Sequence, residues 1–277
     1  RPVTTIVEEI KKVDIPNVAP VFDTASLDTS DTVDTAADDA LAAPVTGTLV
    51  ATDTDGGAMS YSGSATGTYG RLVVNGDGTY SYFINNAAVQ AVTADTSETF
   101  EVAVSDGQGG ATTANLIFTI KGANDAPVIL NSSDTLSLAT IREDPTTNNG
   151  QTVADLLTAR FSDRDAGASL GGVVITGNAA TASQGVWQWS TDGTNWVDVA
   201  TSFATDTGLA LDATTRLRFS PSTDWNSTQG AVGKLTMLVT DDVYSAGYSS
   251  IDDTVAPVSV TSSTVSTTAS GVSTNSI

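Results

Sequence analysis

The chain has 277 residues, 40% of them hydrophobic, and 32 acidic against 11 basic side chains give it a formal net charge of −21. An acidic surface repels phosphate groups and anionic lipids, so we expect no nucleic-acid partner and no docking on anionic membranes. No apolar run approaches transmembrane length, so we expect no membrane insertion. The sequence has no cysteine and no histidine, which excludes disulfides, His-ligated zinc and Ser-His-Asp catalysis. A chain of this length is expected to form about two domains.

The first predicted element is an apolar stretch, residues 2–15, which we interpret as a strand. The spacing of its valines and isoleucines would also fit an amphipathic helix. Asn17-Val18-Ala19-Pro20 follows, and proline ends ladder pairing and extends the residue before it. We therefore predict that residues 1–20 are an N-terminal strand and linker. The strand either ends a preceding module or is donated to the sheet edge of a neighbouring subunit.

Short β-branched runs with turn signals between them make up most of the remaining chain. Asp77-Gly78 and Asp192-Gly193 are typical of hairpin turns. Two short helices are expected at 85–92 and 151–159. This pattern predicts an all-β sandwich fold. The expected strands are 71–74, 79–84, 99–104, 116–120, 173–176, 186–190, 217–219 and 235–239.

A short internal repeat sets the predicted domain boundaries. Asn124-Asp125-Ala126-Pro127 repeats the pattern at Asn17–Pro20, and such Pro-containing stretches are natural links between sandwiches. We predict one β-sandwich at 21–126 and a second at 127–277. The second includes a Ser/Thr-rich tail from Ser262 that reads as a linker or as an edge strand.

The first predicted module resembles the VCBS repeat of large bacterial RTX-type surface adhesins. The matching stretches are Val45–Gly56, Gly67–Leu72, Asn75–Tyr82, Asn85–Gln90, Phe100–Gly110 and Asn124–Pro127. The acidic insertion 23–43 departs from that pattern.

The second module resembles, more loosely, the cadherin-like and Ig-like domains that accompany VCBS repeats. The stretches that carry this resemblance are Ile141–Asp144, Phe161–Gly167, Gly185–Trp196, Arg216–Pro221 and Asp224–Asn226.

These resemblances imply a non-catalytic structural or adhesive module outside the cell, on a bacterial surface or in a secreted fibre. The leading hypothesis is a calcium-stiffened rod that extends a surface adhesin, with neighbouring modules or subunits of the same assembly as partners. Two alternatives stay open. One is a self-assembling fibre subunit that donates residues 2–15, and the other is a domain that binds a glycan or peptide.

Calcium is the predicted cofactor, because hard cations bind carboxylate, amide and carbonyl oxygens. An Asp-x-Asp pair on an extended segment presents both carboxylates on one side. By resemblance, Asp53, Asp55, Asp106, Asn124 and Asp125 are grouped around the first module. Glu143, Asp144, Asp163, Asp165 and Asp241 are grouped around the second. The alternative is that these are turn residues with no metal, since Asp before Gly is common in turns.

All four tryptophans lie in the second module. Trp187 and Trp189 alternate on one predicted strand and so share a face, which favours core packing over an exposed ligand platform. Trp225 is predicted as a surface aromatic, and together with Asp224 and Asn226 it is the candidate ligand-binding group.

Overall fold

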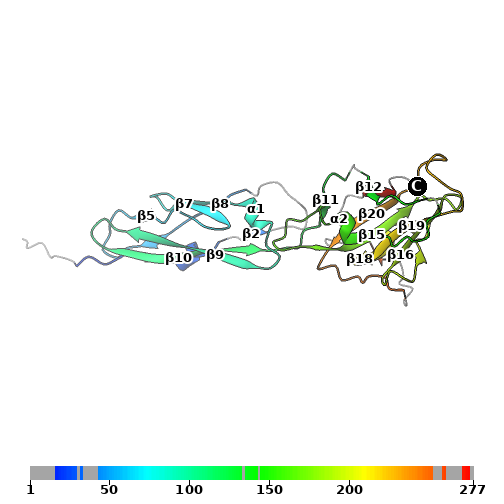
Figure 1. Cartoon of the computed structure of the whole chain (residues 1–277). Coiled ribbons are helices and arrows are strands. Elements are labelled where there is room, and N and C mark those ends of the chain that lie inside the picture. The colour runs from blue at the N-terminus through cyan, green and yellow to red at the C-terminus, as the bar shows by residue number, and fades with distance from the viewer. Residues whose placement is uncertain are drawn as a thin grey trace, which may run out of the picture. The chain divides into compact units, whose positions relative to one another are not determined.

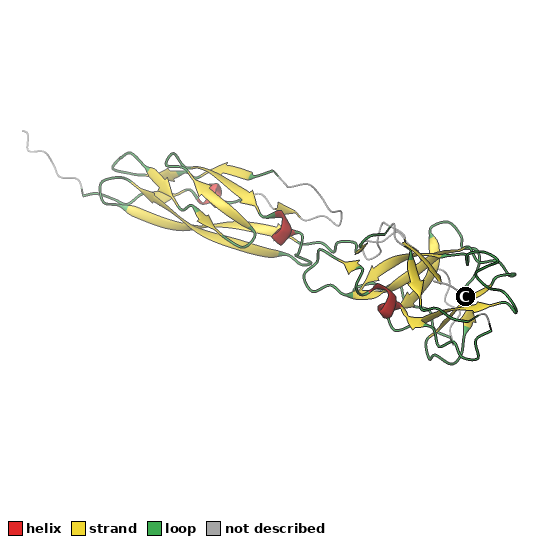
Figure 2. Ribbon diagram, turned by 45° about the horizontal axis from the view of Figure 1, so that its top comes forward, coloured by secondary structure: helices red, strands yellow, loops and turns green. Residues whose placement is uncertain are grey.

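The computed structural model describes residues 16–29, 32–33, 43–132, 135–142, 144–251, 258–259 and 270–274. They form two compact units (Figure 1). Unit 1 holds the described residues from 16 to 33, 43–89 and 95–121, and unit 2 holds 90–94 and the described residues from 122 onward. Both units are built mainly of strands (Figure 2). No helix in the described part of the chain is long and apolar enough to span a membrane.

Unit 1 contains two four-stranded sheets, one in the order β2-β10-β9-β5 and the other in the order β3-β8-β7-β6. A separate antiparallel pair joins β1 to β4. The elements are β1 (Val21–Phe22), η1 (Thr24–Leu27), β2 (Thr32–Val33), β3 (Val45–Thr48), β4 (Ala51–Thr52), β5 (Ser60–Ser62), β6 (Ala65–Thr66), β7 (Gly70–Val74), β8 (Thr79–Ile84), α1 (Asn86–Val89), β9 (Thr96–Ser105) and β10 (Ala111–Lys121).

The core of unit 1 lies between these two sheets. Side chains alternate along β8 and β10, so that Tyr82, Leu116 and Phe118 point inward and are fully buried. The Tyr82 ring stacks on the Phe118 ring, with 4.0 Å between centroids. Alternating burial is the pattern that a strand with one face on the core requires. Unit 1 is therefore a β-sandwich with an aromatic core.

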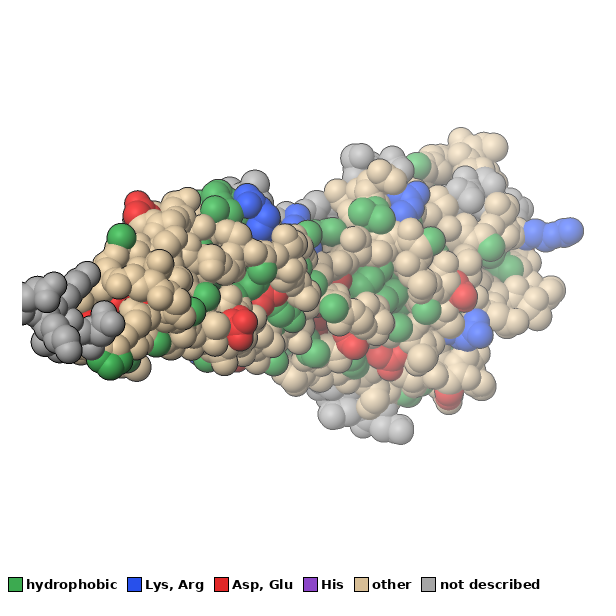
Figure 3. Space-filling model, turned by 90° about the vertical axis from the view of Figure 1, so that its left-hand side faces the viewer, with side chains coloured by type: hydrophobic (Ala, Val, Ile, Leu, Met, Phe, Trp, Pro, Cys, Tyr) green, Lys and Arg blue, Asp and Glu red, His purple; other side chains and the backbone are tan. Residues whose placement is uncertain are grey.

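The outward positions of the strands carry mostly small polar side chains, such as the exposed Thr113 on β10. On the face drawn in Figure 3, hydrophobic side chains are scattered in small groups among polar, largely uncharged surface. Single exposed apolar side chains of this kind are normal on a soluble protein. The large apolar side chains are concentrated between the sheets.

Unit 2 contains a six-stranded sheet in the order β12-β22-β20-β15-β18-β21 and a four-stranded sheet in the order β13-β19-β16-β17. A short antiparallel pair joins β11 to β14. The elements are β11 (Val128–Ile129), β12 (Leu136–Leu138), β13 (Gln151–Thr152), α2 (Val153–Leu157), β14 (Phe161–Ser162), β15 (Leu170–Asn178), β16 (Gly185–Ser190), β17 (Val197–Asp198), β18 (Thr207–Asp212), β19 (Arg216–Pro221), β20 (Leu235–Asp241), β21 (Val258–Ser259) and β22 (Ser270–Thr274).

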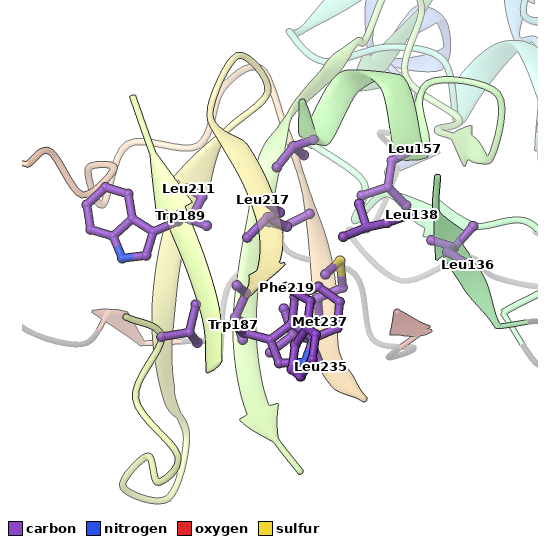
Figure 4. Close-up of a cluster of buried hydrophobic side chains, with 14 of the residues drawn as sticks. Leu136, Leu138, Leu157, Trp187, Trp189, Leu211, Leu217, Phe219, Leu235 and Met237 are labelled. Carbon is purple, nitrogen blue, oxygen red and sulfur yellow. The ribbon is translucent and has the colours of Figure 1, made fainter. Parts of the chain in front are cut away.

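The core of unit 2 is built around tryptophan. Trp187 is fully buried and meets Phe219 edge-on, with 5.4 Å between ring centroids. Figure 4 shows Trp187 and Phe219 gathered with Leu235 and Met237 from the facing sheet. The indole Nε1 donates a hydrogen bond to the Gly233 carbonyl at 2.8 Å, so its polar end is satisfied inside the core. Trp189 is also buried, and the predicted core role of both tryptophans is confirmed.

The predicted turns and short helices are confirmed as well. Gly78 and Gly193 have φ angles of 89° and 73°, which suit the tight turns that precede β8 and follow β16. Helix α2 begins with a capping box, in which Thr152 and Asp155 each accept a hydrogen bond from the other's backbone N–H. Each strand expected between residues 71 and 239 overlaps a strand of the structure.

Two predictions concern the ends of the chain. The N-terminal strand at 2–15 lies outside the described residues. Within the Ser/Thr-rich tail, residues 270–274 form β22, which pairs with β12 on one side and β20 on the other. This stretch is therefore an internal strand of its sheet, whereas the sequence suggested a linker or an edge strand.

Candidate cation-binding sites

The first acidic cluster lies where strands of unit 1 end. Asp53 and Asp55 follow β4, Asp106 follows β9, and Asn17 stands shortly before β1. Asn17 Nδ2 donates to Asp106 Oδ2 at 2.9 Å. The Val18 N–H donates to Asp55 Oδ2 at 2.7 Å, and the Asp55 N–H to Asp53 Oδ1 at 3.3 Å. The Asn-x-Ala-Pro segment is thus tied to carboxylates from two strand ends.

Asp106 is the most enclosed member of this first cluster, with 1% of its surface exposed. Its Oδ1 accepts the N–H groups of Gln108 at 2.7 Å and Gly110 at 3.0 Å. Burial raises the pKa of Asp106, but these two donors and Asn17 outweigh burial, so the pKa is lowered. A Cβ at position 110 would collide with the Asp106 carboxylate, so a glycine is needed there. Asp106 is therefore held as a carboxylate.

The other two acids of the first cluster, Asp53 and Asp55, each have a buried oxygen without a hydrogen-bond donor among the described residues. Asp53 Oδ2 and Asp55 Oδ1 are buried and accept no hydrogen bond from any described residue. A side-chain hydrogen bond with Asp55, and after it burial, raises the pKa of Asp53. Buried carboxylate oxygens are costly unless a donor or a cation compensates them. This pair of oxygens can therefore accept a cation.

The second cluster lies in unit 2 and is joined in the same way. Asn124 Nδ2 donates to Asp241 Oδ2 at 2.9 Å. The Asp125 N–H donates to Asp165 Oδ2 at 2.9 Å, and the Asp165 N–H to Asp163 Oδ1 at 2.9 Å. Asp241 ends β20, and Asp163 and Asp165 follow β14. The repeat of the tetrapeptide in the sequence is therefore a repeat of tertiary contacts.

Burial and crowding are stronger in the second cluster. Asp125, Asp165 and Asp241 are only 2%, 7% and 1% exposed, and Asp163 Oδ2 is buried without a hydrogen bond from any described residue. Burial, together with the charges of Asp163 and Asp242, raises the pKa of Asp241 to about 6 despite the hydrogen bond from Asn124. Burial also raises the pKa of Asp163. Carboxylates that repel one another in this way are stabilised by a divalent cation.

The structure corrects the predicted grouping of these residues. Asn124 and Asp125 follow the last strand of unit 1 in the sequence and were grouped with its acids. Their hydrogen bonds instead go to Asp241 and Asp165. The reason is that the backbone N–H at 125 faces the acid that follows β14, which tertiary folding brings to it.

One further predicted ligand does not join the cluster in the structure, and another, Glu143, lies outside the described residues. Asp144 is exposed, and no hydrogen bond joins it to the other acids among the residues that the structure describes.

The predicted surface role of Trp225 is wrong. Its side chain is 8% exposed and packs edge-on against Phe219, with ring centroids 6.1 Å apart. Asp224 has a φ of 61°, and this left-handed turn puts the indole into the core. Asp224 is exposed, and the Asn226 side chain accepts the Thr228 N–H at 3.1 Å within the same loop. The polar neighbours of Trp225 in the sequence gave the wrong signal.

Two residues in or next to the clusters were not among the predicted ligands. Asn17 holds Asp106, and the match between the two Asn-x-Ala-Pro segments could have revealed it. Asp242 accepts the Ser169 N–H at 3.2 Å and acts on the pKa of Asp163 and Asp241.

Within the described residues, no group of three or more His, Cys, Asp or Glu side chains is placed so that it could hold a metal ion. The clusters are acids held by backbone and amide donors, with buried oxygens beside them. Binding a cation would therefore require these carboxylates to move closer together. The donor set, all oxygen, fits Ca²⁺ or another hard cation and not zinc or copper.

The comparisons with known proteins agree with a cadherin-like module. Residues 17–122, which include the whole first cluster, match the family described as bacterial cadherin-like domain. No curated protein matched the chain. The match supports a cadherin-like module in unit 1, while the finer resemblance to a VCBS repeat of an RTX adhesin stays a prediction.

Similar solved structures are cadherin ectodomains. Human protocadherin-24 EC1-2 is 16% identical with a TM-score of 0.41, over 94% of this chain and 98% of that one. Mouse cadherin-23 EC22-24 is 15% identical with a TM-score of 0.45, over 93% of this chain and 66% of that one. Protocadherin gamma B7 domains 1–4 is 16% identical with a TM-score of 0.45, over 92% and 49%. The sheets described above show that both units have an all-β fold.

Proposed function

We propose that the chain is a non-catalytic segment of an extracellular bacterial protein for adhesion or structure, and that Ca²⁺ binds at both acidic clusters. The observation that carries this proposal is the recurrence of one arrangement. In each unit an Asn-x-Ala-Pro segment is hydrogen-bonded to an Asp-x-Asp pair and to an aspartate at the end of a long strand. Turn chemistry alone gives no reason for the same three strand ends to be brought together twice.

Particular oxygens would hold the cation. In unit 1 they belong to Asp53, Asp55 and Asp106, and in unit 2 to Asp125, Asp163, Asp165 and Asp241. Ca²⁺ takes six to eight oxygen ligands and tolerates irregular geometry, so carbonyls and water can complete each site. The bound ion would neutralise the neighbouring carboxylates that contribute to the raised pKa values of Asp53 and Asp241. It would also fix the Asn-x-Ala-Pro segment against its own unit.

Two features of the chain, its residue types and the lining of its pocket, favour a non-catalytic role. The chain has neither histidine nor cysteine. A pocket of about 170 Å³ in unit 2 is lined by side chains without an ionisable group. Its lining is Leu138, Ala139, Ile141, Thr147, Asn148, Asn149, Gly150, Gln151 and Phe219. This supports a structural rather than an enzymatic role, with the segment extending a surface adhesin as a calcium-stiffened rod between neighbouring modules.

Thermal unfolding with calcium and with a chelator tests the proposal. A ligand at a hundred times its dissociation constant stabilises the folded state by about 2.7 kcal/mol. For units of this size, that corresponds to a rise in Tm of roughly 5–15 °C. Asp53→Asn and Asp163→Asn should each reduce the rise, because each removes a carboxylate with a buried oxygen.

Two matched controls remove a charge elsewhere. Glu101→Gln lies at an exposed position of β9 in unit 1, and Asp224→Asn lies in an exposed turn of unit 2 where asparagine tolerates the left-handed φ. Both should keep the full response to calcium. Identical melting curves with calcium and with chelator would refute the calcium role.

A further inference from the structure

The two clusters correspond contact by contact, so their residues can be paired. Asn17 corresponds to Asn124 through the bond to the aspartate after the long strand. The backbone N–H of Val18 corresponds to that of Asp125 through the bond to the second acid of the Asp-x-Asp pair. The correspondence rests on hydrogen bonds and not on sequence alignment alone.

At that paired position the side chains differ in kind. Asp125 brings a carboxylate that is 2% exposed, inside the second cluster. Val18 brings an alkyl group that is 47% exposed. The valine side chain has no oxygen, so the first cluster lacks the carboxylate that Asp125 supplies to the second.

A second paired position differs in the same direction. Asp241 corresponds to Asp106, and the next residue is Asp242 in unit 2 but Gly107 in unit 1. Asp242 is exposed and accepts the Ser169 N–H at 3.2 Å, so it stands next to the cluster but is not one of its buried carboxylates. Among the described residues, the first cluster therefore has three carboxylates, Asp53, Asp55 and Asp106. The second has four, Asp125, Asp163, Asp165 and Asp241.

Oxygen sites for calcium are tuned largely by the number of charged ligands and by the rigidity of the site. Resting on the calcium role proposed above, we infer that the two clusters bind Ca²⁺ with unequal affinity. The cluster of unit 2 fills first, and that of unit 1 fills only at a calcium concentration about tenfold or more higher. Val18 in place of aspartate is the main cause.

The consequence is a range of calcium concentrations in which the chain is half loaded. There unit 2 is fixed by its cation while unit 1 keeps the repulsion between Asp53 and Asp55. The first cluster is then the part of the chain whose stability responds to a change in external calcium, and the second is constitutively filled. One chain thus contains a structural site and a responsive site of the same design.

Isothermal titration calorimetry of the whole chain with Ca²⁺ tests the inference. The unmodified chain should show two classes of site whose dissociation constants differ about tenfold or more. Val18→Asp should tighten the weak class toward the tight one, and Asp125→Asn should weaken the tight class toward the weak one. Val21→Asp adds the same charge three residues further on, at a side chain that is 62% exposed, and should leave both classes within about twofold, because surface charges are screened.

Asp53→Asn and Asp163→Asn assign the classes, since the first should abolish the weak class and the second the tight class. Circular dichroism checks that each variant is folded, and Asp125→Asn is nearly isosteric should Val18→Asp prove unstable. Calcium binding with a single affinity for both sites would overturn the inference and leave the proposed function standing. So would a Val18→Asp chain that binds calcium like the unmodified one. A chain that binds no calcium at all would overturn both.

Discussion

The two units tie their acidic clusters in the same way but fill their cores differently. Unit 1 packs tyrosine and phenylalanine between its sheets, with Tyr82 stacked on Phe118. Unit 2 packs Trp187 and Trp189 against Phe219 and adds the helix α2 at its core. The clusters keep their contacts although the side chains beneath them differ. Their geometry therefore depends on where strands end and not on what fills the sandwich.

The largest expected effect comes from breaking one core and leaving the other. Trp187→Ala should destabilise unit 2 by about 3–5 kcal/mol, because it removes a fully buried indole and its hydrogen bond to Gly233. All four tryptophans lie in unit 2, so denaturation followed by tryptophan fluorescence reports that unit. Calcium binding by the unit 1 cluster should persist.

Phe118→Ala is the matched substitution in unit 1. It should leave the tryptophan transition in place and shift the tyrosine signal instead. If both substitutions shifted both transitions equally, the units would unfold as one, and the separation of cluster from core would be wrong.

An intermediate effect should come from Gly110→Ala, which tests whether calcium binding by the first cluster depends on the position of the Asp106 carboxylate. The new Cβ would meet the Asp106 carboxylate, so the loop or the carboxylate must shift at a cost of about 1–3 kcal/mol. Calorimetry should show loss of the weaker calcium class, with the stronger class unchanged. Gly76→Ala, where a Cβ would meet only ordinary van der Waals contact, should behave like the unmodified chain. Full calcium binding by Gly110→Ala would show that Asp106 is not part of the site.

The smallest expected effect is a pH dependence that separates the second cluster from the first. The pKa of Asp241 is raised to about 6 from its ordinary value of 3.8. The folded state therefore holds a proton that the unfolded state has lost between these values. In chelator, the stability of unit 2 should fall by about 1–2 kcal/mol as pH rises from 4 to 7.

Calcium should reverse this slope, because binding needs deprotonated carboxylates. Tryptophan-detected urea denaturation at pH 4.5 and pH 7, with and without calcium, measures the change. Asp241→Asn should flatten the slope in chelator. If the stability of the unmodified chain in chelator did not change with pH, the raised pKa of Asp241 would be contradicted.

The sequence by itself determined the local parts of this protein. Alternation along 79–84 and 116–120 gave strands with one buried face, and Asp-Gly pairs gave the turns, because side-chain period and backbone preference are local properties. The Asp-x-Asp pairs, together with Asn124 and Asp125, were likewise recognisable from the sequence as candidate ligands.

Only the tertiary structure decided which of these parts meet. Asn124 and Asp125 are adjacent in sequence to unit 1, yet they bond to acids that follow β14 and end β20 of unit 2. Trp225 has polar neighbours, yet the turn at Asp224 directs it onto Phe219. Hydrogen bonds and burial depend on segments far apart in the chain, whose approach is set by sheet order. For that reason the sequence showed two sets of acids, whereas the fold showed which positions in the two sets correspond. Asp125 and the exposed Val18 occupy equivalent positions, because the backbone N–H of each donates to the second acid of an Asp-x-Asp pair.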